Sequence, residues 1–468
     1  MRDLLLFAII MGLVPITLMK PWIGVVGWYW VGMMSPHGLT WGFMQTFPLA
    51  MVIGGATLIA LVLTKDRRPL PFTREIALLV VLAAYVTLTS YLAINPSGAW
   101  SQWTNFMKIL AITFVAPMLV YGEKRVLVLL IVITSSLAFY GLKGGLFSIL
   151  TGGQHMVLGP PRSFLAGNTY IGMAMVMILP MILVTARMLR EQWVDWGRGW
   201  IQKFSVPAGW GFYGVFWLTA VAILATYSRG ALLGILAVAP FIFLRMRHKL
   251  VLVAMAVLLV VGVGVTVPDK LMARWQTIQT YEEDQSAMQR IQAWGVNWNM
   301  AQESPLVGMG FGNRGMGYDW WIQFAEFEGE WRHILSPHST YFQVLGEHGF
   351  VGLGIYLLML VFMLLTLRRI QMTAKQRTGQ LWLAEYAWAM KIGLIGFMVS
   401  AAFLDMAYFE LIYAFLALTV IMRRELDEGM ARVGGGKMDL VPTEPRGAVP
   451  RYPGFVADNS QDAVRGER

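Results

Sequence analysis

Long apolar runs, separated by short polar connections, make up most of this chain. Of its 468 residues 57% are hydrophobic and only 14% are charged, and its mean hydropathy is +0.57. A soluble protein of this size could not bury so much apolar surface in domain cores, whereas a run of about 18 apolar residues is long enough to cross a bilayer. We therefore predict an all-α, polytopic integral membrane protein. The thirteen runs are Leu4–Met19, Trp22–Met34, Phe47–Thr64, Ile76–Leu92, Phe106–Tyr121, Val126–Tyr140, Tyr170–Ala186, Trp210–Tyr227, Ala231–Leu244, Leu250–Val267, Tyr341–Leu367, Ala387–Leu404 and Tyr408–Met422.

The first two runs leave the number of crossings open. Both are short, and Lys20-Pro21 separates them. If both cross fully, the N-terminus is external; if they form one broken crossing or a shallow hairpin, the total is about twelve transmembrane helices and the N-terminus is cytoplasmic. We favour about twelve. The N-terminus lacks a small-residue cleavage site, so we interpret it as a retained membrane segment.

Basic clusters occur at every second connection, which indicates the orientation. Because cytoplasmic loops of membrane proteins are rich in Lys and Arg, these connections are predicted to be cytoplasmic, and the C-terminus with them. The intervening segments are then external. They include 141–169, the turn at 228–230 and 267–340. The basic connections are Lys65–Arg68, Glu123–Arg125, Arg187–Lys203, Arg245–Lys249, Arg368–Arg377 and Arg423-Arg424.

This orientation divides the chain into four parts. We predict an N-terminal transmembrane bundle (1–267), a large periplasmic loop with catalytic elements (268–339), C-terminal transmembrane helices (340–424) and a disordered cytoplasmic tail (425–468) rich in Gly, Pro, Arg and Asp. Within the loop, apolar residues recur at helical spacing, which predicts an amphipathic helix from about Ser286 to Gln302.

Composition excludes several kinds of site. The chain has no cysteine, so it has no disulfide framework, thiolate metal site or cysteine nucleophile. Its net charge of +10 is typical of basic cytoplasmic loops, and no basic stripe with interleaved aromatic residues indicates nucleic-acid binding. No P-loop and no cluster of metal-ligating residues is evident in the sequence.

Three arginines and a histidine fall on the predicted external face. Arg162, Arg229 and Arg290 run against the positive-inside bias. Arginine forms bidentate bonds to phosphate, so the three around a cleft would suit a diphosphate. His338 places an imidazole, which titrates near neutral pH, at the membrane boundary. Each also has a structural interpretation: a helix cap or interfacial anchor, a partner for a loop carboxylate, a solvated helix residue, or a histidine satisfied at the interface.

Other charged residues are weaker candidates. Lys108, within an apolar run, and Lys143, in a glycine-rich segment, could contact phosphate or extend to the membrane surface. Glu347 follows His338 by nine residues, near the opposite side of an ideal helix. We therefore expect it to support the site rather than pair with His338.

Several motifs together resemble the O-antigen ligase and polymerase superfamily. They are Arg162–Asn168, Ser228-Arg229-Gly230, Arg290–Trp294, Pro305–Gly310 and, as the most specific, His338–Gly349 with its Ser339, Tyr341 and Glu347. The Lys143-Gly-Gly and Gly167-Asn168-Thr169 segments are also similar to exosortase-associated putative O-glycosylation ligases. The resemblance covers nearly the whole chain except the tail.

The resemblance implies an enzyme of the bacterial inner membrane that transfers a glycan from undecaprenyl diphosphate to a lipid A–core sugar hydroxyl on the periplasmic side, without metal or cofactor. His338 would be the base, with Arg162, Arg229, Arg290, Lys108 and Lys143 around the diphosphate and Asn168, Tyr341 and Glu347 in support. A single inverting displacement is the expected chemistry, because no carboxylate nucleophile is evident.

Alternatives remain open. An O-antigen polymerase or a protein O-oligosaccharyltransferase would share the base and the diphosphate site and differ in the acceptor. A transporter or flippase for a lipid-linked sugar would line a path with the arginines, but no inverted repeat is visible in the sequence. A membrane scaffold is a further alternative.

Overall fold

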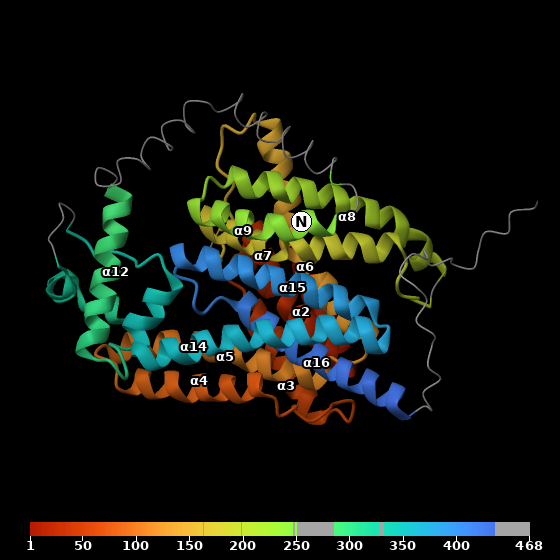
Figure 1. The fold of residues 1–468 in the computed structure, drawn as a ribbon, viewed down its shortest axis with the longest axis horizontal. Helices are drawn as coiled ribbons and strands as arrows, with labels where there is room; N and C mark the ends of the chain where they lie inside the picture. The colour runs from red at the N-terminus through yellow and green to blue at the C-terminus, as the bar shows by residue number, and fades with distance from the viewer. Residues whose placement is uncertain (162, 198, 247–248, 250–284, 327–331, 436–468) are drawn as a thin grey trace, which may run out of the picture.

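Long helices packed side by side form the body of the molecule, and one helix crosses their end (Figure 1). The computed structural model describes residues 1–161, 163–197, 199–246, 249, 285–326 and 332–435, and these contain helices and no strand. The predicted run Leu250–Val267 lies outside the described residues. The main helices are α1 (Arg2–Met19), α2 (Pro21–Met34), α3 (Leu49–Leu63), α4 (Arg74–Tyr91), α5 (Pro96–Leu119), α6 (Glu123–Leu150), α7 (Asn168–Arg190), α8 (Gly199–Ala225), α9 (Arg229–Arg245), α12 (Gln285–Glu303), α13 (Tyr318–Trp321), α14 (Thr340–Thr373), α15 (Leu381–Ser400) and α16 (Glu410–Gly435).

Seven helices among the described residues are long and apolar enough to cross a membrane. The prediction of an all-helical, membrane-spanning chain is confirmed to that extent, and the expected total of about twelve remains a prediction. Helix α7 is the most enclosed of the seven, with 89% of its apolar window buried. It packs against α8 and α15 and lies at the centre of the bundle.

The first two apolar runs form two separate antiparallel helices. Asp3, at the start of α1, accepts hydrogen bonds from the backbone N–H groups of Gly42 (2.9 Å) and Met44 (3.2 Å), which follow α2. At the other end of the pair, Trp22 lies under the guanidinium of Arg125. Pro21 starts a new helix, since it lacks the N–H that would continue α1. A single broken crossing is therefore wrong, whereas the choice between two full crossings and a shallow hairpin stays a prediction.

Basic connections gather at the end of the bundle opposite α12, which we call the basic end. Arg68 pairs with Glu428, and Arg125 pairs with Asp66 at 2.9 Å. The Arg68–Glu428 pair joins residues that are distant in sequence. Helix α16 accordingly continues to Gly435, past the boundary predicted at residue 424. Glu425 and Leu426, just beyond that boundary, are buried. Residues 436–468 lie outside the described part.

A loop of glycines docks on a kink in α14. Gly349 has φ +67° and ψ −171°, a conformation open mainly to glycine, and interrupts α14. There Phe350 donates its backbone N–H to Pro305 (2.9 Å), while the N–H groups of Met309 and Gly310 bond the carbonyls of Gly346 and Glu347. The kink thus fixes the loop that follows α12 against the start of α14.

Replacing Gly349 by alanine is expected to destabilise the protein by roughly 2–4 kcal/mol, through a strained φ and overpacking. A Cβ at this position would meet the carbonyl oxygens of Pro305 and Leu306 at 2.6 and 2.8 Å. Thermal unfolding of purified protein in detergent measures the effect. Gly354→Ala, in the same helix with no atom within 4 Å of its added Cβ, is the matched control. Equal unfolding temperatures for the two variants would contradict the role given to the kink.

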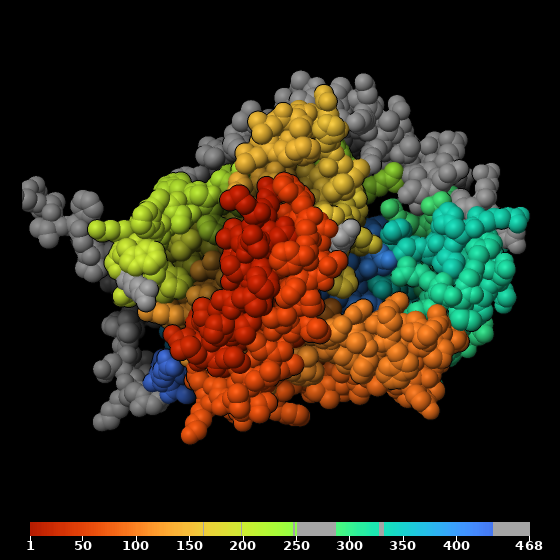
Figure 2. Space-filling view, turned by 180° about the vertical axis from the view of Figure 1, so that it is seen from behind, coloured from red at the N-terminus to blue at the C-terminus, as the bar shows by residue number. Residues whose placement is uncertain are grey.

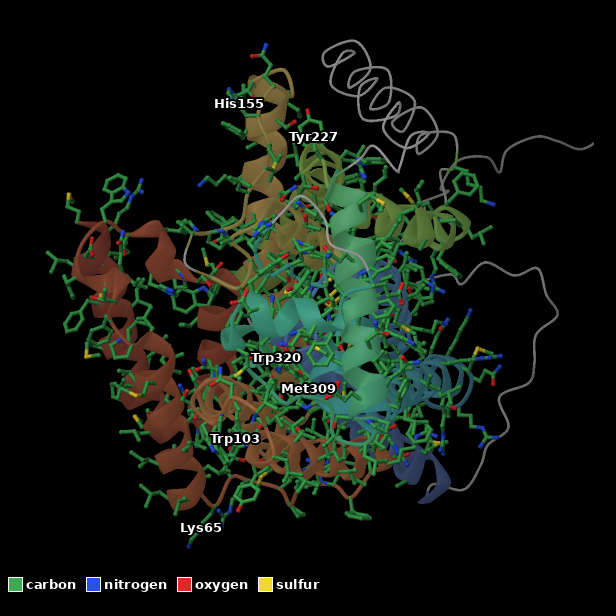
Figure 3. The ribbon with its side chains drawn as sticks, turned by 90° about the vertical axis from the view of Figure 1, so that its left-hand side faces the viewer. Lys65, Trp103, His155, Tyr227, Met309 and Trp320 are labelled. Atoms are coloured by element: carbon green, nitrogen blue, oxygen red, sulfur yellow. The ribbon has the colours of Figure 1, made fainter. Side chains whose placement is uncertain are left out.

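Helix α12 confirms the predicted loop helix almost to the residue. It spans Gln285–Glu303, against an expected Ser286–Gln302. Viewed from the α12 end, Met309 and Trp320 lie beside it (Figure 3). Its apolar residues Ala293, Val296 and Met300 are buried with Trp321 in a cluster separate from the main core. Helix α12 is therefore part of a small packed unit over the end of the bundle.

Candidate active site

His338 occupies the turn that leads into α14. Its φ of +42° lies in the left-handed region, which non-glycine residues rarely adopt. The neighbouring residues hold it there: Trp294 donates its indole N–H to the carbonyl of Pro337 (2.7 Å), and Thr340 donates its hydroxyl to the carbonyl of Leu404 (2.7 Å). The His338 side chain is 46% exposed. A fixed backbone thus presents an imidazole that a substrate can reach.

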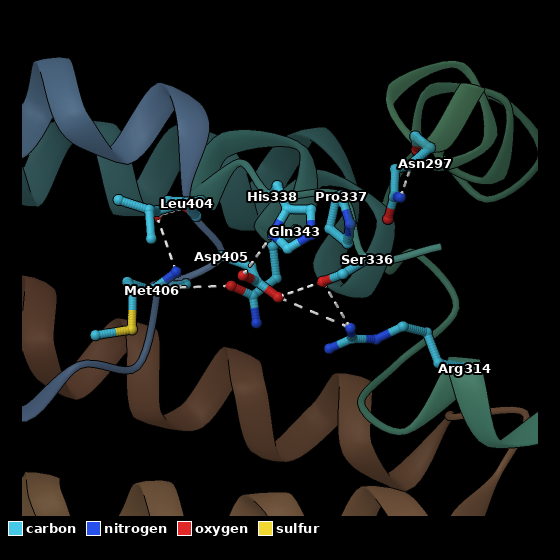
Figure 4. A network of polar contacts seen from close by, with 12 residues as sticks. Asn297, Arg314, Ser336, Pro337, His338, Gln343, Leu404, Asp405 and Met406 are labelled. Atoms are coloured by element: carbon cyan, nitrogen blue, oxygen red, sulfur yellow. Dashed lines mark hydrogen bonds and ion pairs between the residues drawn. The ribbon is translucent and has the colours of Figure 1, made fainter. Parts of the chain in front are cut away.

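Asp405 faces His338 across this turn (Figure 4). Its Oδ1 lies 3.7 Å from Nδ1 of His338 and accepts a hydrogen bond of 3.0 Å from the hydroxyl of Tyr170. Its Oδ2 accepts from the hydroxyl of Ser336 and lies 3.8 Å from Nη1 of Arg314. Arg314 also donates to the Ser336 hydroxyl (3.0 Å). The five residues form a polar network that comes from four separate parts of the chain.

Burial and hydrogen bonding act in opposite directions on Asp405. Its side chain is only 9% exposed, and desolvation alone would raise its pKa. The contact with His338, the hydrogen bond from Ser336 and the charge of Arg314 outweigh desolvation and lower the pKa of Asp405 to about 2. The carboxylate is therefore ionised at neutral pH. An anion beside an imidazole can orient the ring and stabilise the imidazolium that forms when it takes a proton.

The turn that carries Arg229 is tied to the segment that leads to Asp405. Ser400 donates its hydroxyl to the carbonyl of Gly230 (3.0 Å). Asn168 donates its side-chain N–H to the carbonyl of Thr226 (2.9 Å), just before the turn, and two residues later Tyr170 reaches Asp405. Half-buried Arg229 thus begins α9 beside these segments.

Arg290 lies on α12, one turn before Trp294. The Trp294 ring stacks on Phe342 of α14, with centroids 5.4 Å apart and ring planes at 9°. Residues four apart share a helix face, so Arg290 lies on the side of α12 that turns toward the start of α14. The side chain of Arg290 is half-buried.

Three further cationic candidates are placed differently. Arg162 lies outside the described residues. Lys108 is exposed on α5 and donates to Asn105 of the same helix (3.3 Å). Lys143 is exposed on α6. No contact described for Lys108 or Lys143 joins either to the network around Asp405, so their diphosphate role stays a prediction.

Glu347 and Tyr341 bind α14 to the C-terminal helices. Buried Glu347 accepts a hydrogen bond of 2.6 Å from the hydroxyl of Tyr408. Tyr341 donates to the carbonyl of Met398 (2.7 Å). Among the described contacts Glu347 is paired with Tyr408 and not with His338. Both residues hold the start of α14 in place, and the turn of His338 with it.

Sequence reasoning missed Asp405, Arg314, Ser336 and Tyr170. Asp405 carried a usable signal, because it is the acid in the short connection between two apolar runs on the predicted external side. Arg314 is one of four arginines in the predicted loop 268–339, but it belonged to no recognised motif. Neither residue is near His338 in sequence.

The molecule is hollowed on one face (Figure 2). Orange residues of α4 and α5, green-cyan residues of the segment between α12 and α14, and yellow residues from the middle of the chain border the hollow. Blue residues of the C-terminal third are visible within it.

The described residues thus form a helical protein with seven helices able to cross a membrane, in which His338 faces Asp405. Two family models match the chain: residues 1–190 match a family of unknown function (DUF5935), and residues 214–357 match the family described as O-Antigen ligase. The second match, over residues 214–357, supports an O-antigen ligase-like superfamily and confirms the resemblance seen in the sequence. No curated protein matches the chain.

The family supports a ligase- or polymerase-type glycosyltransferase that uses a lipid-linked glycan and an acceptor. The matched segment contains Arg229, Arg290, Arg314 and His338, whereas Asp405 lies beyond it.

Proposed function

We propose that this protein is an O-antigen ligase-type glycosyltransferase, which moves a glycan from undecaprenyl diphosphate to a sugar hydroxyl of lipid A–core. The observation that carries the proposal is the exposed imidazole of His338 beside the ionised, buried carboxylate of Asp405. Together with the family match, this pair supplies a base for an acceptor hydroxyl. Arg229 and Arg290, on segments next to the pair, supply positive charge.

The proposed reaction is a single displacement. The acceptor oxygen attacks the anomeric carbon while His338 takes the hydroxyl proton, and the bond from that carbon to the diphosphate oxygen breaks. The diphosphate leaves with the electron pair, so its negative charge grows in the transition state. Arginine guanidinium groups stabilise such charge through bidentate bonds. The anomeric configuration inverts, because one displacement occurs.

The basic end indicates the orientation in the membrane. Its clusters include Arg68 and Arg125, and the positive-inside rule assigns them to the cytoplasm. The end that carries α12, His338 and Asp405 then faces the periplasm, where lipid-linked glycans and lipid A–core meet. We therefore propose a multi-pass inner-membrane protein with a periplasmic active site.

Arg290→Ala is expected to weaken binding of the lipid-linked donor by about tenfold to a hundredfold, on the scale of a lost hydrogen bond to a charged group. The physical reason is the loss of a guanidinium on the side of α12 turned toward the site. Titration of purified protein with donor measures the effect. Arg332→Ala, an exposed arginine in the same segment, is the control. Unchanged donor affinity in Arg290→Ala would remove this residue from the diphosphate site.

Transfer by purified protein tests the proposal itself. A labelled glycan on undecaprenyl diphosphate is offered with lipid A–core, with a second lipid-linked repeat, or with a protein acceptor. Label on lipid A–core supports the ligase; label on the lipid-linked repeat or on protein supports a polymerase or a protein O-oligosaccharyltransferase instead. Movement of the lipid across a vesicle membrane without transfer would support a flippase and overturn the enzyme assignment.

A further inference from the structure

Two adjoining pockets open beside α6, and neither is lined by a residue of the network around Asp405. One, of about 290 Å³, lies between α6 and the loop of residues 156–161. The other, of about 440 Å³, lies between α1, the segment after α2, and α6. Leu39 and Lys143 line both pockets, so the pockets meet at these two residues. Every lining residue falls within 1–190, the part that matches the family of unknown function.

The charges in these pockets are all of one sign. Arg2 and Lys143 are the charged residues in the lining, and no carboxylate joins them. Neither cation forms an ion pair with a described residue, and Arg2 lies over the exposed ring of Trp41, 4.3 Å from its centroid. The positive-inside rule makes cations at this end of a membrane helix unusual. Two of them without an acid therefore indicate an anionic ligand.

Apart from these cations, the pocket walls are apolar. Leu5, Ile9, Phe147 and Leu158 line them and are each between 43% and 64% exposed. Walls of this kind accept hydrocarbon chains, and the cations lie where the chains of a lipid would end in a charged head group.

The packing of α6 sets the position of Lys143. A Cβ on Gly141 or on Gly145 would fall 2.1–2.2 Å from Thr219 and Leu218 of α8, so these two glycines mark the side of α6 that α8 covers. Lys143, between them in sequence, falls on the other side of the helix and is exposed. The close α6–α8 contact thus leaves the lysine facing the pockets.

We propose that residues 1–190 form a docking site for an anionic phospholipid, whose phosphate binds Lys143 and Arg2 and whose acyl chains lie along the apolar walls. Phosphate is the anion that lysine and arginine both bind by charge-assisted hydrogen bonds. The proposal gives Lys143 a phospholipid contact in place of the diphosphate contact expected from the sequence, and no residue of the network around Asp405 takes part.

Lipid binding to the full chain tests the proposal. Purified protein in detergent is titrated with phosphatidylglycerol and with phosphatidylcholine, and bound lipid is counted by native mass spectrometry. Phosphatidylglycerol is expected to bind at least about tenfold more tightly, and the double variant Arg2→Gln, Lys143→Gln is expected to abolish this preference. Lys108→Gln, another exposed lysine with no place in either pocket, should keep it. An unchanged preference in the double variant overturns the proposal.

Two further measurements separate the alternatives. Lys143→Arg keeps the charge and should retain the preference, which distinguishes lost binding from lost folding. A polyprenyl phosphate that displaces phosphatidylglycerol with higher affinity would assign the pocket to a prenyl lipid and overturn the phospholipid assignment. His338→Ala should leave phospholipid binding unchanged, so failure of the transfer proposal and failure of this one give different results.

Discussion

His338→Ala is expected to lower the rate of glycan transfer by about 10²- to 10⁴-fold, the usual contribution of a general base. The imidazole is half-exposed and faces the carboxylate of Asp405, so its removal deprives the acceptor hydroxyl of the group that takes its proton. Donor binding should persist, because arginine side chains and not the imidazole hold the diphosphate in the proposed site. Initial rates of transfer and donor titration, on the same purified variant, measure the two quantities.

His333→Ala provides the control for this variant. His333 lies five residues earlier in the same segment and is exposed, and no described contact joins it to Asp405. Its replacement should leave the transfer rate within about twofold of the parent, as surface substitutions usually do. If His338→Ala transfers glycan at a near-normal rate, the base assignment is wrong, whatever His333→Ala does.

Local sequence pattern predicted the helices well, because each is defined by residues close together in the chain. The apolar runs predicted the helices of the bundle. Helix α12 was predicted from the helical spacing of Ala287, Ile291, Trp294 and Trp298. The break between α1 and α2 was also predictable from adjacent residues, because Pro21 follows Lys20 there. Whether the chain resumed in the same direction or reversed depended on contacts of Asp3 with residues beyond α2, and these could not be read from spacing.

The candidate site was predicted only in part, for a related reason. His338 stood out because a recognisable motif surrounds it. Asp405 is 67 residues away, and it reaches the imidazole only because Thr340 binds the carbonyl of Leu404 and Ser400 binds that of Gly230. Those side chain-to-backbone bonds have no signature in a single sequence. The position of Asp405 between two apolar runs could have marked it as a candidate. Nothing in the sequence indicated that its partner is His338.

Glu347 is a motif residue whose partner could not be predicted from the sequence. Its place in the motif made it attractive, and helix geometry argued against pairing with His338. The structure gives it a different partner, the hydroxyl of Tyr408 at 2.6 Å. Tyr408 follows Asp405 by three residues, so the Glu347 contact and the His338–Asp405 contact hold the same short connection against the start of α14.

Asp405→Asn is expected to lower kcat by about 10²-fold or more while leaving the KM for the lipid-linked donor within a few-fold, as for an acid that orients a catalytic histidine. The substitution keeps the shape of the side chain and removes the charge that faces Nδ1 of His338 at 3.7 Å. An amide can also turn its N–H toward the imidazole and favour the wrong tautomer. Steady-state kinetics with varied donor concentration separate kcat from KM.

Two comparisons make the Asp405 result specific to positioning. Asp319→Asn removes an exposed acid from α13 and should have no comparable effect on kcat. Asp405→Glu restores the charge and should recover part of the rate, which a purely structural defect would not allow. Because Tyr170, Ser336 and Arg314 also bind this carboxylate, Asp405→Asn should in addition lower the unfolding temperature. A loss of stability with unchanged kcat would show that Asp405 supports the fold without orienting His338.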